Sequence, residues 1–179
     1  MKLLRTIRLD PSDTFIFAAA AEPGEWAVSG SFVFWDLDPA ALEGKARTAF
    51  RSGFLGLQSL GWSTLVQIVE TSADGRKQAV EQLARQLVEK FGAPDIQAAT
   101  AAAEDEIAFA ESLATEDKDT LIAVHRRVED GEIREAFRTL KPRNGPAPPR
   151  AFSFFDVVDE PPQPGDDVSL AELAARGSK

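Results

Sequence analysis

The chain has 179 residues, 44% of them apolar, which is enough for one hydrophobic core and short for two. Its formal net charge of -9 argues against sequence-independent nucleic-acid binding, because neutralising phosphates needs a surplus of lysine and arginine on one face. The absence of cysteine excludes disulfides, thiolate catalysis, iron–sulfur clusters and finger-type zinc sites.

Targeting and cofactor signals are missing from the sequence. No stretch has the apolar core of a signal peptide or the roughly 20 apolar residues of a membrane span. No catalytic or cofactor motif stands out either. We therefore expect a soluble, cytoplasmic protein without a cofactor, a membrane contact or a nucleic-acid partner.

The first 35 residues have the pattern of three antiparallel strands. Apolar runs at residues 2–9 and 14–18 flank the turn residues 10–13, as in a β-hairpin. A third run, residues 25–35, alternates apolar and polar side chains, with Gly30 as a candidate bulge. These segments predict a three-stranded meander.

The middle of the chain combines helix and strand patterns. Asp38-Pro39 is a typical helix start, and residues 62–70 have the pattern of a central strand. Apolar residues at helical spacing predict helices over 74–91 and 95–114. The small alanines of the second helix favour close packing, so we expect a helical hairpin on the sheet.

Together the predicted elements indicate an α+β fold. Residues 120–128 form the last predicted strand, and Asp130 caps a short predicted helix. We expect a two-layer sandwich with a mainly antiparallel sheet of about five strands and helices packed on one face. A single domain is expected over residues 1–141, followed by a proline-rich linker at 142–150 and an extended tail at 151–179 that contains a docking strand and a short helix.

Three glycines between a predicted helix and a predicted strand, Gly53, Gly56 and Gly61, raise the question of a phosphate-binding loop. Such loops place their glycines between a strand and the N-terminus of the next helix. Here the order is reversed, so the glycines lie near the partially negative end of a helix. We therefore expect a helix cap, a turn and close packing at these positions.

Titratable side chains give few signs of catalysis or metal binding. His125 is the only histidine, and no serine or aspartate lies at a spacing typical of a catalytic partner, so a structural role is expected. Asp10, Asp13, Asp36 and Asp38 are candidate ligands for a hard cation, but their positions fit turns and a helix cap better. No catalytic residue and no metal site is assigned.

Arginines supply the main candidate for a ligand site. Arg47 and Arg51 are four residues apart on one predicted helix, and Arg5, Arg126 and Arg127 lie in predicted strands. If these side chains converge, their guanidinium groups suit a carboxylate or a phosphate. Tryptophans provide a candidate pocket wall, although core packing is their more frequent use. The ligand-binding candidates are Arg5, Arg47, Arg51, Trp62, His125 and Arg127.

The tail contains an apolar decapeptide, AFSFFDVVDE, outside the predicted domain. An apolar segment of this kind must be buried somewhere, either on an edge of its own sheet or on another chain by strand addition. Because the linker is short, we favour burial of the apolar segment on the sheet of the same chain. Phe152, Phe154 and Phe155 are the candidates for contact with a protein partner or a second copy of the chain.

Several segments resemble a bacterial domain-of-unknown-function family found in alphaproteobacteria. They cover most of residues 1–143 and read MKLLRTIRLDPSDTFIF, AEPGEWAVSG, ALEGKARTAFRSGFLGLQSLGWSTLVQIVE and TLIAVHRRVEDGEIREAFRTLKPR. The family has no assigned activity, so the resemblance implies no catalytic residues. It does imply a genetic setting near proteins that resemble a biotin or lipoate ligase and maturation factors of molybdenum-type redox enzymes.

Two functional hypotheses follow. The first is a non-enzymatic accessory protein that binds a protein partner through its tail during assembly or cofactor loading of a redox enzyme. The second is a small-molecule binding domain or enzyme that holds an anionic ligand in an arginine- and histidine-lined pocket.

Overall fold

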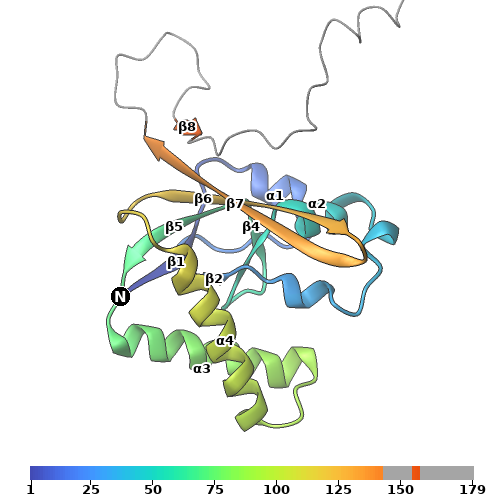
Figure 1. The fold of residues 1–179 in the computed structure, drawn as a ribbon, viewed down its shortest axis with the longest axis vertical. Helices are drawn as coiled ribbons and strands as arrows, with labels where there is room; N and C mark the ends of the chain where they lie inside the picture. The colour runs from blue at the N-terminus through green and yellow to red at the C-terminus, as the bar shows by residue number, and fades with distance from the viewer. Residues whose placement is uncertain (143–154, 158–179) are drawn as a thin grey trace, which may run out of the picture.

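The computed structural model describes residues 1–142 and 155–157, which form an α+β structure (Figure 1). The strands are β1 (Lys2–Ile7), β2 (Trp26–Val28), β3 (Phe54–Gly56), β4 (Trp62–Ser63), β5 (Leu65–Glu70), β6 (Leu121–Glu129), β7 (Glu132–Pro142) and β8 (Phe155–Val157). The helices are α1 (Ser12–Ile16), α2 (Gly44–Ser52), α3 (Ala73–Phe91) and α4 (Ile96–Leu113), with 3-10 turns η1 (Ser31–Phe34) and η2 (Pro39–Ala41). Within residues 1–142, seven antiparallel strands form one curled sheet in the order β4-β3-β2-β1-β5-β6-β7, and β8 pairs outside β7.

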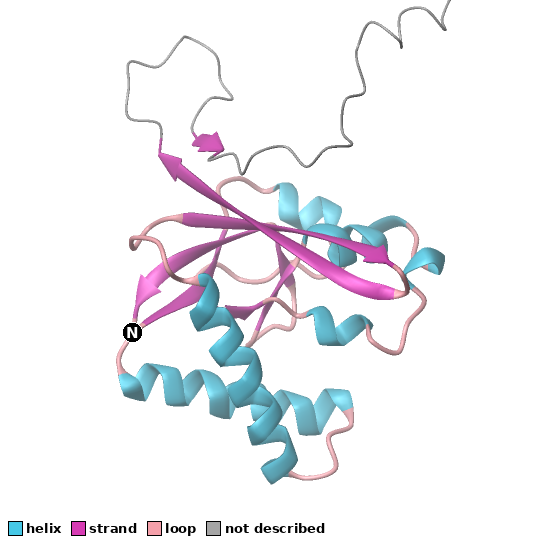
Figure 2. Cartoon of the chain, viewed as in Figure 1, coloured by secondary structure: helices cyan, strands magenta, loops and turns pink. Residues whose placement is uncertain are grey.

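Two apolar clusters pack the helices against the sheet. The larger one joins α3 and α4 to the central strands, where Leu4, Ile68 and Leu83 are fully buried. The smaller one contains Phe17 and Phe50 and lies around α2 and η1. Figure 2 shows the corresponding division of the helices, with α3 and α4 on one side of the molecule and α1 and α2 on the other.

The prediction of two long helices is confirmed almost to the residue. Ser72 caps α3 by accepting a hydrogen bond from the Gly75 amide, and Asp95 caps α4 in the same way. Gly92 ends α3 in the left-handed conformation, with φ of 73°. Arg76 then ties the two helices into a hairpin through ion pairs with glutamates of α4.

The predicted three-stranded meander is wrong. Residues 14–18 belong to α1 and the turn after it, because the buried Asp13 carboxylate accepts the Thr64 amide hydrogen and ties this otherwise mostly exposed helical turn to the segment between β4 and β5. The run at 25–35 leaves the strand after Val28, because Gly30 is left-handed, with φ of 77°, and a 3-10 turn follows. Gly30 therefore turns the chain rather than forming a bulge.

The helix predicted after Asp130 is also wrong, since this segment is strand β7. Asp130 and Gly131 have φ of 53° and 79°, the left-handed pair required by a two-residue hairpin turn. β6 and β7 then pair in register from Glu129 with Glu132 to Leu121 with Leu140. The Asp-Gly signal for a hairpin was present in the sequence and outweighs the helical spacing of the apolar residues.

The number of strands is the remaining correction to the fold class. The antiparallel α+β prediction is confirmed, but seven strands lie within residues 1–142 instead of about five. The prediction missed β3 and β7, and it did not separate β4 from β5 at Thr64. The predicted linker at 142–150 begins one residue too early, because Pro142 ends β7, and residues 143–150 and most of the tail lie outside the described residues.

Candidate functional site

A hollow of about 350 Å³ lies between α2, η2 and the end of β6 near the hairpin turn. Its apolar walls come from Pro39, Ala40, Phe50 and Val128. Its polar lining consists of basic groups only, contributed by Arg47, Arg51, His125, Arg126 and Arg127. Among the described residues, no carboxylate or hydroxyl group lines this hollow, which we call the basic hollow.

The alternation of β6 decides which basic groups face solvent. His125 and Arg127 are exposed, whereas Arg126 between them is 1% exposed and points into the protein. Burial lowers the pKa of His125, and the positive charges of Arg51, Arg138 and Arg127 lower it further. The imidazole is therefore neutral at pH 7 and presents both a donor and an acceptor.

Arg126 fixes the wall of the basic hollow. Its guanidinium donates to the carbonyl oxygens of Phe50 at 3.0 Å and Gly53 at 2.7 Å, which lie at the C-terminal end of α2. Helix C-termini carry unpaired carbonyl groups and a partial negative charge, so a buried cation is favourable there. Nε forms a 2.7 Å ion pair with Glu135 of β7, and Nη2 donates to Ser29. One side chain thus joins α2, β6, β7 and the segment after β2.

The arginines of α2 approach from the other side of the hollow. Arg47 and Arg51 lie one helical turn apart and are both exposed. Nε of Arg47 donates to the Leu42 carbonyl oxygen at 2.7 Å, and Arg51 makes no ion pair with a described residue. Arg127 pairs with Glu129 at 3.0 Å, but both side chains are largely exposed, so the pair is weak.

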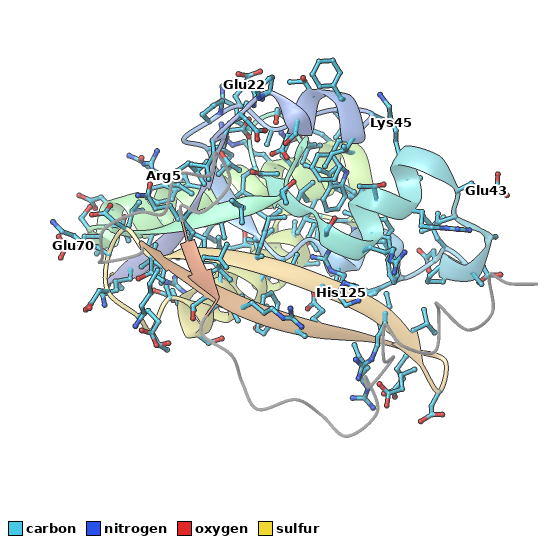
Figure 3. All side chains as sticks on the ribbon, turned by 90° about the horizontal axis from the view of Figure 1, so that it is seen from above. Arg5, Glu22, Glu43, Lys45, Glu70 and His125 are labelled. Carbon is cyan, nitrogen blue, oxygen red and sulfur yellow. The ribbon has the colours of Figure 1, made fainter. Side chains whose placement is uncertain are left out.

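The structure therefore brings together Arg47, Arg51, His125 and Arg127 of the six predicted ligand-binding residues. It does not bring Arg5 or Trp62 to the same place. Figure 3 shows Arg5 and His125 at well-separated parts of the sheet. The Arg5 guanidinium lies 3.8 Å from the ring centroid of Trp26, and Trp62 stacks on Phe34 in the core at 5.3 Å between centroids.

The glycines at positions 53, 56 and 61 allow close packing of the chain, as expected. A Cβ atom at Gly61 would lie 2.5 Å from the backbone of Ala20, and one at Gly53 would lie 2.7 Å from the Trp62 ring. Gly53 caps α2, and Gly56 ends β3 rather than forming an isolated turn. These contacts explain the glycines without a bound phosphate.

Three of the four aspartates considered as cation ligands bind protein groups instead, and no contact of this kind is seen for Asp36 among the described residues. The Ser12 side chain and the Ser12 amide, which lies at 2.8 Å, lower the pKa of the Asp10 carboxyl group by hydrogen bonding to it, and Asp38 accepts the amide hydrogen of Ala40 at 3.0 Å. Asp13 accepts from Thr64. Over residues 1–142, no three acidic or histidine side chains come together as a metal-binding group.

Glu106 of α4 does not line the basic hollow but lies close enough to Arg126 and Glu135 to interact with their charges, which no sequence pattern indicates. Burial and the nearby Glu135 carboxylate raise its pKa to about 7, against an opposing effect of Arg126. Its Oε2 atom is buried and has no hydrogen-bond partner among the described residues. Because Glu106 occupies a helix with many exposed acids, only its neighbours in space distinguish it from them.

The partner-binding candidates of the tail can be placed only in part. Phe152 and Phe154 lie outside the described residues, and Phe155 begins β8. The backbone of Phe155–Val157 pairs with Leu140–Pro142 of β7, so the docking strand adds to its own sheet.

Comparison with known proteins places the chain in a family. A model of a Family of unknown function (DUF6505) matches residues 1–148. The chain belongs to this family. No curated protein and no solved structure gives a significant match. The DUF6505 match includes every residue that lines the basic hollow, and none of the described helices is long and apolar enough to cross a membrane.

Proposed function

We propose that the protein binds a small organic anion in the basic hollow. The main support for this proposal is that Arg47, Arg51 and Arg127 converge on one hollow, although the chain as a whole has a net charge of -9. Guanidinium groups recognise carboxylates and phosphates through paired, charge-assisted hydrogen bonds. Arg51 is the central residue of the proposal, because it faces the hollow without an ion-pair partner among the described residues.

The apolar walls favour an organic ligand over a bare inorganic ion. Pro39, Phe50 and Val128 offer carbon surface beside the arginines. A volume of about 350 Å³ lies within the usual size range of small-molecule sites. The neutral His125 side chain can add one hydrogen bond to a ligand oxygen without a charge. Binding of the ligand, rather than its conversion, is the function that these groups support.

Thermal unfolding of the full chain with millimolar benzoate, citrate, phosphate or pyrophosphate tests the proposal. A ligand that binds the folded state alone raises the melting temperature by mass action. We expect at least one organic anion to raise it, and Arg51→Ala to remove the rise. Arg85→Ala is the matched control, because it removes an exposed arginine from α3.

Two outcomes would count against the site. If none of the four anions changes the melting temperature, the hollow does not bind this class of ligand. If Arg85→Ala removes the rise as effectively as Arg51→Ala, the anions act through general charge and not through the basic hollow.

A second candidate function is the accessory role in which the chain binds a protein partner. Its support is β8, because the pairing of Phe155–Val157 with β7 shows that this edge accepts an added strand. Recovery of partners from the native cytosol by the full chain and by a chain without residues 150–179 tests this role. Equal recovery by both would remove the tail from the hypothesis.

A further inference from the structure

The basic hollow continues into a wider basic face on the β6–β7 hairpin. In the antiparallel register, Arg127 lies opposite Arg134, and Arg138 lies opposite Ala123 on the strand that carries His125. Arg51, Arg127 and Arg138 all lie near enough to lower the pKa of His125. Glu132 partly offsets Arg134 through a 2.8 Å ion pair, whereas Arg51 and Arg138 form no ion pair within the described part of the chain. We call Arg51, Arg127, Arg134 and Arg138 the basic face.

Strand β8 gives a direction to the chain that follows it. Phe155 lies opposite Pro142 and Val157 lies opposite Leu140. Because the pairing is antiparallel, β8 is directed along the free part of the β7 edge, toward Arg138 and then toward the hairpin turn.

The sequence immediately after β8 complements the basic face in charge. Residues 158–167 read VDEPPQPGDD and contain four carboxylates with no lysine or arginine. Ten extended residues can span about 33 Å, and the strand from Leu140 back to Ile133 covers about 23 Å. The segment is therefore long enough to reach the basic hollow. Its prolines lack an amide hydrogen, so contact through carboxylates is expected rather than a continued strand ladder.

We propose that the acidic segment of residues 158–167 docks on the basic face of its own chain and competes with anions for the basic hollow. This rests on the function proposed above, because it assigns the segment and the ligand to the same arginines. The segment then competes with weakly binding anions for the same arginines.

A spin label provides a direct test in the full chain. The chain has no cysteine and one histidine, so Gly165→Cys carries a unique label and the His125 ring gives an unambiguous NMR signal. We expect the label to broaden the His125 signal, and the broadening to disappear in about 0.5 M salt, where exposed charges are screened. The triple variant Arg51→Gln, Arg127→Gln, Arg138→Gln should abolish it. A label at Lys77→Cys on the exposed side of α3 is the control and should leave the signal sharp.

The outcomes separate this inference from the proposed function. A sharp His125 signal with the Gly165→Cys label overturns the docking. Docking within one chain is also overturned if the His125 signal broadens only when spin-labelled chains are mixed with separate isotope-enriched chains. A second copy of the chain would then occupy the basic face. If docking leaves one molecule in four open, neutralising Asp159, Glu160, Asp166 and Asp167 with their amides should tighten benzoate binding by about fourfold. Anion binding without docking would refute the inference alone, and docking without any anion binding would refute the proposed function.

Discussion

Arg126 shows how a single buried cation can hold the wall of the basic hollow in place from inside the protein. Its guanidinium is satisfied by Glu135, Ser29 and the carbonyl oxygens at the end of α2. These contacts hold α2 against β6, which keeps Arg47 and Arg51 beside His125. Its role therefore differs from that of the exposed arginines, although all of them line the same hollow.

Replacing Arg126 should cost much more stability than replacing its neighbour. Arg126→Met leaves the Glu135 carboxylate without its cation and several carbonyl groups without a donor, so we expect a loss of about 3–5 kcal/mol in the free energy of unfolding. Arg127→Met removes only an exposed ion pair and should cost at most about 1 kcal/mol. Denaturant unfolding of both variants measures the difference. Similar losses would show that Arg126 is not the clamp described above.

Glu106 predicts a pH dependence of stability. Its pKa is raised from 4.5 to about 7, so the folded state holds this proton more tightly than the unfolded state. Its favourable contribution is complete below about pH 4.5 and is lost as the pH rises through 7. At pH 8, Glu106→Gln should therefore raise the free energy of unfolding, by about 3 kcal/mol at most.

Denaturant unfolding at pH 5 and pH 8 measures this effect for the parent chain, Glu106→Gln and the exposed control Glu89→Gln. The advantage of Glu106→Gln over the parent should be largest at pH 8, whereas Glu89→Gln should follow the parent at both values. A Glu106→Gln variant with an unchanged pH profile would show that this carboxyl group titrates normally.

At the level of elements, the β6–β7 hairpin determines the site, and its turn can be tested directly. Gly131 has φ of 79°, so Gly131→Ala places a side chain in the left-handed region and should cost about 1 kcal/mol. Asp130→Asn is the matched control, because asparagine is equally suited to this turn. Thermal unfolding compares the two variants. Equal stability of Gly131→Ala and the parent would contradict the assigned turn.

The same hairpin explains how far the sequence could predict the structure. α3 and α4 were predictable because apolar spacing, caps and length all agree over 18 or more residues. β7 was missed because Ile133, Phe137 and Leu140 recur at helical spacing, and this spacing was weighted above the Asp-Gly hairpin signal at residues 130–131. β3 is only three residues long, too short for periodicity to identify, and β2 was predicted within the run 25–35 but extended too far.

Prediction of the site had a similar limit. Arg47 and Arg51 could be paired from helical spacing, and His125 and Arg127 from the alternation of a strand. Their convergence depends on how α2 packs beside β6, which no local pattern encodes. Arg126 was considered with the other arginines, but its buried, structural role was not predicted, and neither was the buried carboxyl group of Glu106, because burial of a charged group becomes visible only in three dimensions.

For the whole molecule, the distribution of buried side chains predicts that the C-terminal part is dispensable for folding. Among the residues whose side chains the structure describes, every core residue of the two apolar clusters lies within residues 3–124, and the partly buried ones packed against them end at Phe137. A chain that ends at residue 148 retains all of them together with the whole DUF6505 match. Deleting residues 149–179 should therefore change the free energy of unfolding by about 1 kcal/mol or less, because it removes the short β8 and exposed charge contacts.

Denaturant unfolding of the shortened and full chains, with the slope of the transition recorded for each, checks this expectation. The slope measures the surface exposed on unfolding, so a tail without a share in the core leaves it nearly unchanged. A loss of about 3 kcal/mol or more, with a smaller slope, would show that Phe152, Phe154 and Phe155 bury their rings on the domain. That result would also change the nature of the competition at the basic face, since apolar anchoring of residues 152–155 would hold the acidic segment near the arginines even at high salt.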